Sequence, residues 1–153
     1  MGHIWQWRRW PLWLCAPLIL LLVACGEAAS SPGAASAPAG AQTVTITEGD
    51  FSIKASLTTF KAGVPYHFVI TNQGIVAHEF LIMPRSMGAT TQHMSMDEMH
   101  HQALAAVENI PPGATVTLDY TFPASAAGSH PEFACYLPGH YEAGMKLAVS
   151  VQR

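Results

Sequence analysis

The decisive stretch of this 153-residue chain reads Cys135-Tyr136-Leu137-Pro138-Gly139-His140-Tyr141-Glu142-Ala143-Gly144-Met145. It places a thiol, an imidazole and a thioether on one short segment with Cys-x4-His-x4-Met spacing. A second imidazole, His78, lies upstream within an apolar run. Two imidazoles and a thiolate, with a weak thioether donor, are the ligands of a type 1 copper site. The pattern therefore predicts one copper ion held by His78, Cys135, His140 and Met145.

The sequence around these donors alternates between apolar and polar residues, which is typical of β-strands. About seven short strands, separated by Gly, Pro and Asn, predict an all-β, Greek-key β-sandwich over residues 43–153. Three donors, His78, Cys135 and Met145, share the parity of the apolar residues in their own strands. We therefore expect them to point into the core at one pole of the sandwich, while His140 comes from a loop.

One segment departs from this two-residue period. Ser95-Met96-Asp97-Glu98 has the form of a capping box, and apolar residues recur at helical spacing up to Asn109. This pattern predicts one short helix of about three turns, in a crossover that ends before Pro111.

The N-terminus has the features of an export signal. Residues 1–24 contain Arg8 and Arg9, an apolar run and a small-residue end, and they are followed by Cys25. The tail Leu22-Val23-Ala24-Cys25 resembles the lipobox of bacterial lipoproteins, which implies that Cys25 is lipidated. An ordinary signal peptide and an uncleaved anchor are the alternatives. Residues 25–42, rich in Ala, Ser, Gly and Pro, predict a flexible tether.

Cysteine usage and charge narrow the possible functions. Cys15 lies inside the signal and Cys25 is assigned to lipidation, so Cys135 has no cysteine partner in the domain, and a metal bond is one chemical reason for its presence. After the signal there are five basic and ten acidic residues, a net charge of −5. No basic stripe or aromatic platform is present, which argues against binding to nucleic acid.

Together these residues resemble the cupredoxins, the blue copper proteins. The resemblance covers nearly all of residues 43–153 and includes Thr71-Asn72-Gln73-Gly74 before His78, and Pro138-Gly139-His140. The loop spacing is closer to that of rusticyanin and auracyanin than to that of plastocyanin. The resemblance implies a monomeric electron carrier in which the edge of His140 is the exit port, ringed by Tyr136, Leu137 and Pro138.

Glu79 departs from the commonest cupredoxin pattern, in which Asn follows the first histidine and ties the two ligand segments together. An ionised glutamate cannot donate that hydrogen bond. The stiffness and the potential of the site are therefore expected to differ from the common pattern, although the ligand set is retained.

A segment rich in Met and His lies between Met83 and Met99 and continues to His101. It resembles the thioether-rich strings that bind Cu(I) in exported copper-handling proteins. The alternative is that Met side chains there fill the core. The residues that would make a second, labile Cu(I) site are Met87, His93, Met94, Met96 and His101.

Two functions follow from this sequence. The first is a single-electron carrier in the periplasm or cell envelope, lipid-anchored through Cys25 to a bacterial membrane, with a cytochrome or an oxidase docking near His140. The second is copper tolerance, in which the protein sequesters or delivers copper through its Met and His segment. An enzyme is disfavoured, since copper oxidases and nitrite reductases need further copper centres and domains.

Overall fold

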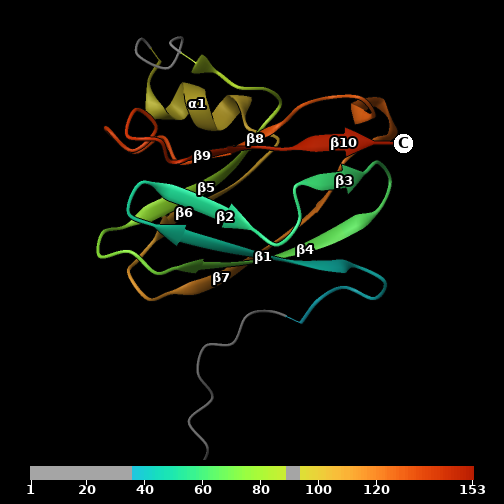
Figure 1. Cartoon of the computed structure of the whole chain (residues 1–153), viewed down its shortest axis with the longest axis horizontal. Helices are drawn as coiled ribbons and strands as arrows, with labels where there is room; N and C mark the ends of the chain where they lie inside the picture. The colour runs from blue at the N-terminus through green and yellow to red at the C-terminus, as the bar shows by residue number, and fades with distance from the viewer. Residues whose placement is uncertain (1–35, 89–93) are drawn as a thin grey trace, which may run out of the picture. The chain divides into compact units, whose positions relative to one another are not determined.

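The computed structural model describes residues 36–88 and 94–153, and these contain ten strands and one α-helix (Figure 1). The strands are β1 (Gln42–Gly49), β2 (Ser52–Ala55), β3 (Thr59–Lys61), β4 (Pro65–Asn72), β5 (His78–Met83), β6 (Ala105–Ile110), β7 (Thr115–Thr121), β8 (Glu132–Ala134), β9 (Lys146–Ala148) and β10 (Ser150–Gln152). The helix is α1 (Met96–Gln102), and a 3-10 turn, η2, spans Ala124–Ala126.

Two four-stranded sheets form the sandwich. The first has the order β2-β1-β4-β7, and the second has the order β6-β5-β8-β9. Strands β1 and β4 run parallel, whereas the other pairs in both sheets are antiparallel. A third, two-stranded sheet pairs β10 with β3 in parallel. The predicted all-β sandwich with a short helix in a crossover is confirmed.

The core between the sheets contains a cluster of aromatic rings. Phe60 lies within 6 Å of Phe68, Phe122 and Phe133, measured between ring centroids. The same cluster of buried residues contains Cys135 and Met145. The sequence parity therefore placed these two sulfur-bearing side chains on the correct, inward-facing side of the chain.

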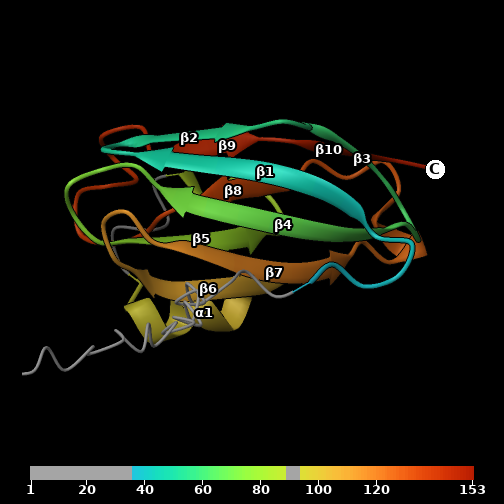
Figure 2. The same cartoon turned by 90° about the horizontal axis from the view of Figure 1, so that it is seen from below.

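Strand β5 is buried on both faces. Phe80 and Ile82 belong to the core between the sheets, whereas Leu81 and Met83 belong to a second apolar cluster that includes Met99 of α1. Figures 1 and 2 show why, because α1 lies on the outer side of the sheet that contains β5 and β6. All six residues of β5 are buried as a result.

The helix starts where the sequence predicts it and ends earlier. Ser95 accepts a hydrogen bond from the backbone N–H of Glu98, whose side chain accepts in return from the Ser95 backbone, so the capping box is confirmed. The expectation of helix up to Asn109 is wrong, because Ala105–Ile110 forms β6 and pairs with β5. Hydrogen bonds to the sheet outweigh the helical spacing of the apolar residues there.

Two strand expectations also need correction. Phe51 has the parity of the inward-facing Ile53 in the alternating sequence, but it lies in a turn with a φ of 63° and is 47% exposed. The apolar residues Met145, Leu147, Val149 and Val151 alternate as in one strand, but the chain is divided at Val149 into β9, which pairs with β8, and β10, which pairs with β3. The chain thereby passes from one sheet to another.

The predicted signal peptide, the lipidation site Cys25 and most of the tether lie outside the described residues. Within residues 36–88 and 94–153, no helix is long and apolar enough to cross a membrane.

Candidate metal centre

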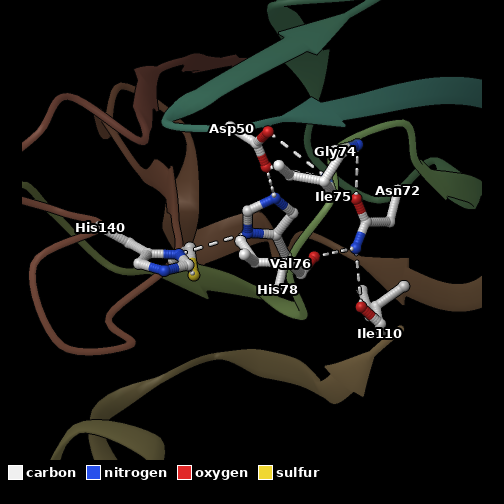
Figure 3. A network of polar contacts seen from close by, with 9 residues as sticks. Asp50, Asn72, Gly74, Ile75, Val76, His78, Ile110 and His140 are labelled. Atoms are coloured by element: carbon white, nitrogen blue, oxygen red, sulfur yellow. Dashed lines mark hydrogen bonds and ion pairs between the residues drawn. The ribbon is translucent and has the colours of Figure 1, made fainter. Parts of the chain in front are cut away.

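Three of the four predicted donors converge at one pole of the sandwich. The Nδ1 atoms of His78 and His140 lie 3.3 Å apart, and the Sγ atom of Cys135 lies 3.3 Å from Nδ1 of His140. The candidate ligand atoms of all three residues lie within 4.8 Å of one another. His78 and Cys135 are fully buried, and His140 is partly exposed. Figure 3 shows the contact between one nitrogen of each imidazole ring.

Two separate segments supply these donors. His78 is the first residue of β5, whereas Cys135 follows the last residue of β8. Backbone hydrogen bonds close the loop between β8 and β9. The N–H of Met145 donates to the carbonyl oxygen of His140 at 3.0 Å, and the N–H of Cys135 donates to the carbonyl oxygen of Met145 at 3.1 Å. Gly144 permits this closure with a φ of 107°.

Met145 lies at the same pole. Its side chain is fully buried and belongs to the apolar cluster that contains Cys135. The two backbone hydrogen bonds described above tie Met145 to both Cys135 and His140. The Met145 thioether is therefore buried in the protein, and Met145 lies close to Cys135 and His140 in the sequence.

The donor set fits one copper ion. Metal–imidazole bonds of about 2.0–2.1 Å require two bound nitrogens to lie within about 4.2 Å of each other. The 3.3 Å between the two Nδ1 atoms meets this condition. Burial raises the pKa of the Cys135 thiol to about 12, so a cation is needed to stabilise its thiolate at neutral pH. Thiolate with imidazole is the donor combination that suits copper in both oxidation states.

The loop before His78 is held by Asn72. The buried Asn72 amide donates to the carbonyl oxygens of Val76 and Ile110, each at 2.8 Å, and accepts from the N–H of Gly74 at 2.8 Å (Figure 3). The Asn72 side chain therefore ties the turn that precedes His78 to the last residue of β6. Asn72 therefore fixes the entry of the chain into the ligand strand.

Asp50 and Gly74 approach the far side of the His78 ring. Oδ1 of Asp50 lies 3.5 Å from Nε2 of His78, close enough for an electrostatic contact but without hydrogen-bond geometry. A Cβ atom at Gly74 would overlap the Asp50 carboxylate and lie 2.8 Å from Nε2 of His78. Burial and the neighbouring His140 lower the pKa of His78, while Asp50 partly opposes that change. His78 is thereby kept neutral, as a metal ligand must be.

Solved structures with the same architecture include auracyanins, and auracyanin A is described as a blue copper protein. Auracyanin from Roseiflexus castenholzii matches with a TM-score of 0.59 at 22% identity, covering 74% of this chain and all of that one. Auracyanin B matches with a TM-score of 0.60 at 20% identity, covering 77% of this chain and 94% of that one. This chain has the cupredoxin fold. No protein-family model matches it.

Curated relatives of this chain carry the name copper-resistant cuproprotein CopI. The protein from Rubrivivax gelatinosus is 38% identical over 61% of this chain and 56% of its own length. The protein from Pseudomonas aeruginosa is 28% identical over 91% of this chain and 96% of its own length. The aligned region thus spans about half of the first relative and nearly all of the second.

The mouth of the site differs from the sequence expectation at Tyr136. Tyr136, expected to ring the exposed edge of His140, is only 6% exposed and stacks on Tyr141 with ring centroids 4.7 Å apart. Pro138 is exposed and Leu137 partly exposed. Further exposed apolar residues near the site are Phe51, whose ring meets that of His140 edge-on, and the pair Ile75 and Val76. Ile75 and Val76 precede the ligand His78 by only three and two residues, and this proximity in the sequence could have identified them.

Glu79 links the two ligand segments despite its departure from the common cupredoxin pattern. Its Oε1 atom accepts a hydrogen bond at 2.8 Å from the backbone N–H of Tyr136, the residue after Cys135. The link is therefore made with the carboxylate as acceptor. The stiffness of the site does not depend on a donor at position 79.

The structure brings only part of the predicted second site together. Met94 and Met96 line one cavity of about 380 Å³, and the third thioether in its wall belongs to Met99, which is not among the predicted donors. Met87 does not line it and lies buried in the apolar cluster next to α1, while His101 is exposed. His93 lies outside the described residues.

Proposed function

We propose that this protein binds one copper ion through His78, Cys135, His140 and Met145 and carries single electrons. The observation that supports this function is the convergence of a buried cysteine sulfur and two imidazole nitrogens on one point at the pole of the sandwich. When bound, copper supplies a one-electron couple between Cu(II) and Cu(I).

The protein's own residues prepare this centre for electron transfer. Strand β5 and the closed loop before β9 fix the donors in the absence of metal. Buried aromatic rings such as Phe80 and Phe133 exclude water from the inner side of the site. Only His140 among the three converging donors reaches the surface, so its ring edge is the route by which electrons enter and leave.

We further propose that the protein is exported and anchored by a lipid on Cys25, with a redox protein docking over His140. The support is the lipobox-like sequence before Cys25 and the apolar mouth of the site. A carrier or copper-binding role is proposed rather than catalysis.

Spectroscopy of the purified protein with one equivalent of Cu(II) tests the centre. We expect an intense visible band from charge transfer between the Cys135 sulfur and copper, which disappears in Cys135→Ser and on reduction. Serine preserves the shape of the side chain but does not supply the sulfur. An absent band in the wild-type protein, or an equal band in Cys135→Ser, would contradict the proposal.

A copper-tolerance role is the second candidate, because of the cavity lined by Met94, Met96 and Met99. Three thioethers are soft donors that select Cu(I). The CopI relatives are named for copper resistance, which agrees with this alternative.

Cu(I) titration against a chelator distinguishes the two roles. A second Cu(I) ion that is lost in Met94→Leu/Met96→Leu, but retained in Met83→Leu, supports copper handling. Met83 is a suitable control because it is fully buried and is not among the residues that line the cavity. A single bound ion in every variant supports the electron carrier alone.

A further inference from the structure

The first strand enters the sandwich at the end opposite the copper donors. In the pairing of β1 with β4, Glu48 lies opposite Asn72, which holds the turn before His78. Gln42, at the other end of β1, is therefore about one strand length from the donors, since an eight-residue strand spans about 26 Å. The N-terminal segment that contains Cys25 thus joins the sandwich far from the metal centre, at what we call the distal end.

Backbone contacts bring several segments together at the distal end. Lys61, the last residue of β3, pairs with the last residue of β10, and Arg153 follows directly. The N–H of Gly63 donates to the carbonyl oxygen of Phe122 at 2.8 Å, which joins the turn after β3 to the segment before η2. Strand β5 starts at the copper end, so Arg85, two residues after it, also lies at the distal end. Figure 1 shows the C-terminus with β3 and β10 at this end.

The surface of the distal end contains an apolar hollow. It has a volume of about 210 Å³, and its walls include Pro84, Leu104, Tyr120 and Pro123. Leu104 is 41% exposed. Arg85 directly follows Pro84 and so borders the hollow, whereas Lys61 and Arg153 lie further along the same end. An apolar surface next to basic side chains is typical of proteins that lie on an anionic membrane.

The two ends of the sandwich differ in charge. Three of the five basic residues after the signal lie at the distal end and are exposed, namely Lys61, Arg85 and Arg153. Five exposed acidic residues lie toward the copper end, namely Asp50, Asp97, Glu98, Glu108 and Glu142. The two remaining basic residues, Lys54 and Lys146, do not balance these five carboxylates.

One acidic residue lies toward the distal end. Asp119 is the sixth exposed acidic residue of ranges 36–88 and 94–153, and its Oδ1 atom contacts Nδ1 of His67 at 2.6 Å. A single carboxylate leaves the three basic residues of this end in excess. The distal end is therefore positive and the copper end is negative, although the chain as a whole has a net negative charge.

We propose that the distal end faces an anionic phospholipid bilayer, so that the copper end and the exposed edge of His140 point away from the membrane. This inference rests on the proposed lipid anchor at Cys25. Anionic lipids attract nearby basic side chains and repel carboxylates, and both effects fade within about 10 Å at 0.1 M salt. An acyl chain combined with a basic surface holds a protein more stably on a membrane than either does alone.

The charge difference is what selects the orientation. A chain segment between the lipid and the domain permits either end to approach the bilayer. Only the end that lies within the screening length interacts strongly with the lipid charges. The positive distal end is attracted there and the negative copper end is repelled, so the face on which a redox partner would dock stays open to solution.

Tryptophan fluorescence reports which end meets the bilayer. All four tryptophans of the sequence lie in the predicted signal peptide, so an introduced tryptophan is the single one after the signal is removed. The reporters are Leu104→Trp at the distal end and Ile75→Trp at the copper end, in metal-free, acylated protein on vesicles of phosphatidylcholine and brominated phosphatidylglycerol. We expect the bromines to quench Leu104→Trp at least about twofold more than Ile75→Trp. Equal quenching of the two reporters would overturn the orientation.

Charge reversal tests the cause of the orientation. In Lys61→Glu/Arg85→Glu, combined with the Leu104→Trp reporter, we expect the quenching to fall to the level seen with Ile75→Trp. The matched control, Lys54→Glu/Lys146→Glu, changes the net charge by the same amount outside the distal end and should retain the quenching. Quenching that persists in the first variant, or that is lost equally in both, would show that the distal cations do not orient the domain.

The anchor and the orientation are tested separately. The mass of the protein extracted from membranes shows whether Cys25 carries acyl chains, and an unmodified Cys25 would contradict the anchor. The same reporters are then measured in chains that begin at Cys25 and are coupled through its thiol to a maleimide lipid. Cys135 is buried and therefore protected from this reagent. Because the protein is metal-free throughout, a failure of the copper centre would not change the result.

Discussion

The ring of Phe51 meets the ring of His140 edge to face, with centroids 5.4 Å apart and planes at 87°. Phe51 nevertheless remains 47% exposed, as do Ile75 at 84% and Val76 at 41%. These three residues, which we call the mouth patch, flank the chain segments that carry Asp50 and His78. The fourth large exposed hydrophobic residue among the described residues is Leu104, which adjoins the opposite end of β5.

A charge in the mouth patch is expected to slow electron transfer between molecules. Brief docking of carriers depends on small apolar contacts, and an added carboxylate would repel the partner in a chain that already has a net negative charge. We expect Ile75→Asp to reduce electron self-exchange, measured by NMR line broadening, at least about tenfold at low salt. Leu104→Asp is the matched control and should leave the rate within about twofold. Equal slowing in both variants would contradict docking at the mouth patch.

Glu48 makes the stability of the protein depend on pH. It is fully buried, and neither carboxylate oxygen has a hydrogen-bond partner among the described residues. Burial, with a smaller contribution from Glu79, raises its pKa from 4.5 to about 8. Between these two values the folded state keeps a proton that the unfolded state loses, so the free energy of unfolding falls as pH rises.

The loss through Glu48 is at most about 5 kcal/mol across that interval. In urea unfolding of the metal-free protein, Glu48→Gln should lose less stability than the wild type between pH 5 and pH 8.5. Above pH 8 the variant should be the more stable of the two. Glu142→Gln, at an exposed position, should follow the wild type. A wild-type curve parallel to that of Glu48→Gln would show that Glu48 does not retain its proton.

Asn72 is expected to be costly to replace. In Asn72→Ala the carbonyl oxygens of Val76 and Ile110 lose their donor, so the free energy of unfolding should fall by about 2–4 kcal/mol. Asn72→Asp keeps the acceptor for Gly74 but removes both donated bonds, and it should be no more stable than Asn72→Ala. Urea denaturation measures both variants. A loss below about 1 kcal/mol would mean that the turn does not depend on this amide.

Gly74 should be required for the position of His78. In Gly74→Ala the added methyl group collides with Asp50 and with the His78 ring, and we expect copper affinity to fall at least about tenfold. Removing the Asp50 carboxylate in Gly74→Ala/Asp50→Ala relieves the closer of these collisions and should restore part of the affinity. Chelator competition measures both proteins. An unchanged affinity in Gly74→Ala would show that the turn can relax without moving the ligand.

Copper should stabilise the fold by mass action. Free Cu(II) at about 100 times its dissociation constant should add about 2.7 kcal/mol to the free energy of unfolding. A chelator should reverse the gain, and Cys135→Ser should show little of it. Thermal unfolding with and without copper measures this difference. Equal stabilisation of the wild type and Cys135→Ser would place the bound metal elsewhere.

The sequence was sufficient for the parts of the structure that depend on local pattern. Side-chain parity placed Cys135 and Met145 in the core, and the capping box located the start of α1 at Ser95. The convergence of His78, Cys135 and His140 followed from donor chemistry and spacing, because few other arrangements explain a lone cysteine beside such residues.

The features that the sequence did not give depend on contacts between distant segments. Helical spacing continues through Val107, and only pairing with β5 converts those residues into β6. Phe51 has the parity of Ile53, yet the turn before β2 rotates it outward to His140. The partner of Glu79 was missed because His100 is 21 residues away and belongs to a different element.

Strand β5 is enclosed between the aromatic core and α1. The residues that surround the metal ligands can therefore change independently of the ligands themselves. Substitutions within α1 alter the outer wall of a ligand strand without changing any donor atom. The crossover that contains α1 can therefore diversify while the four donors stay constant. Proteins that share this pole could acquire different redox properties through the segment that covers it.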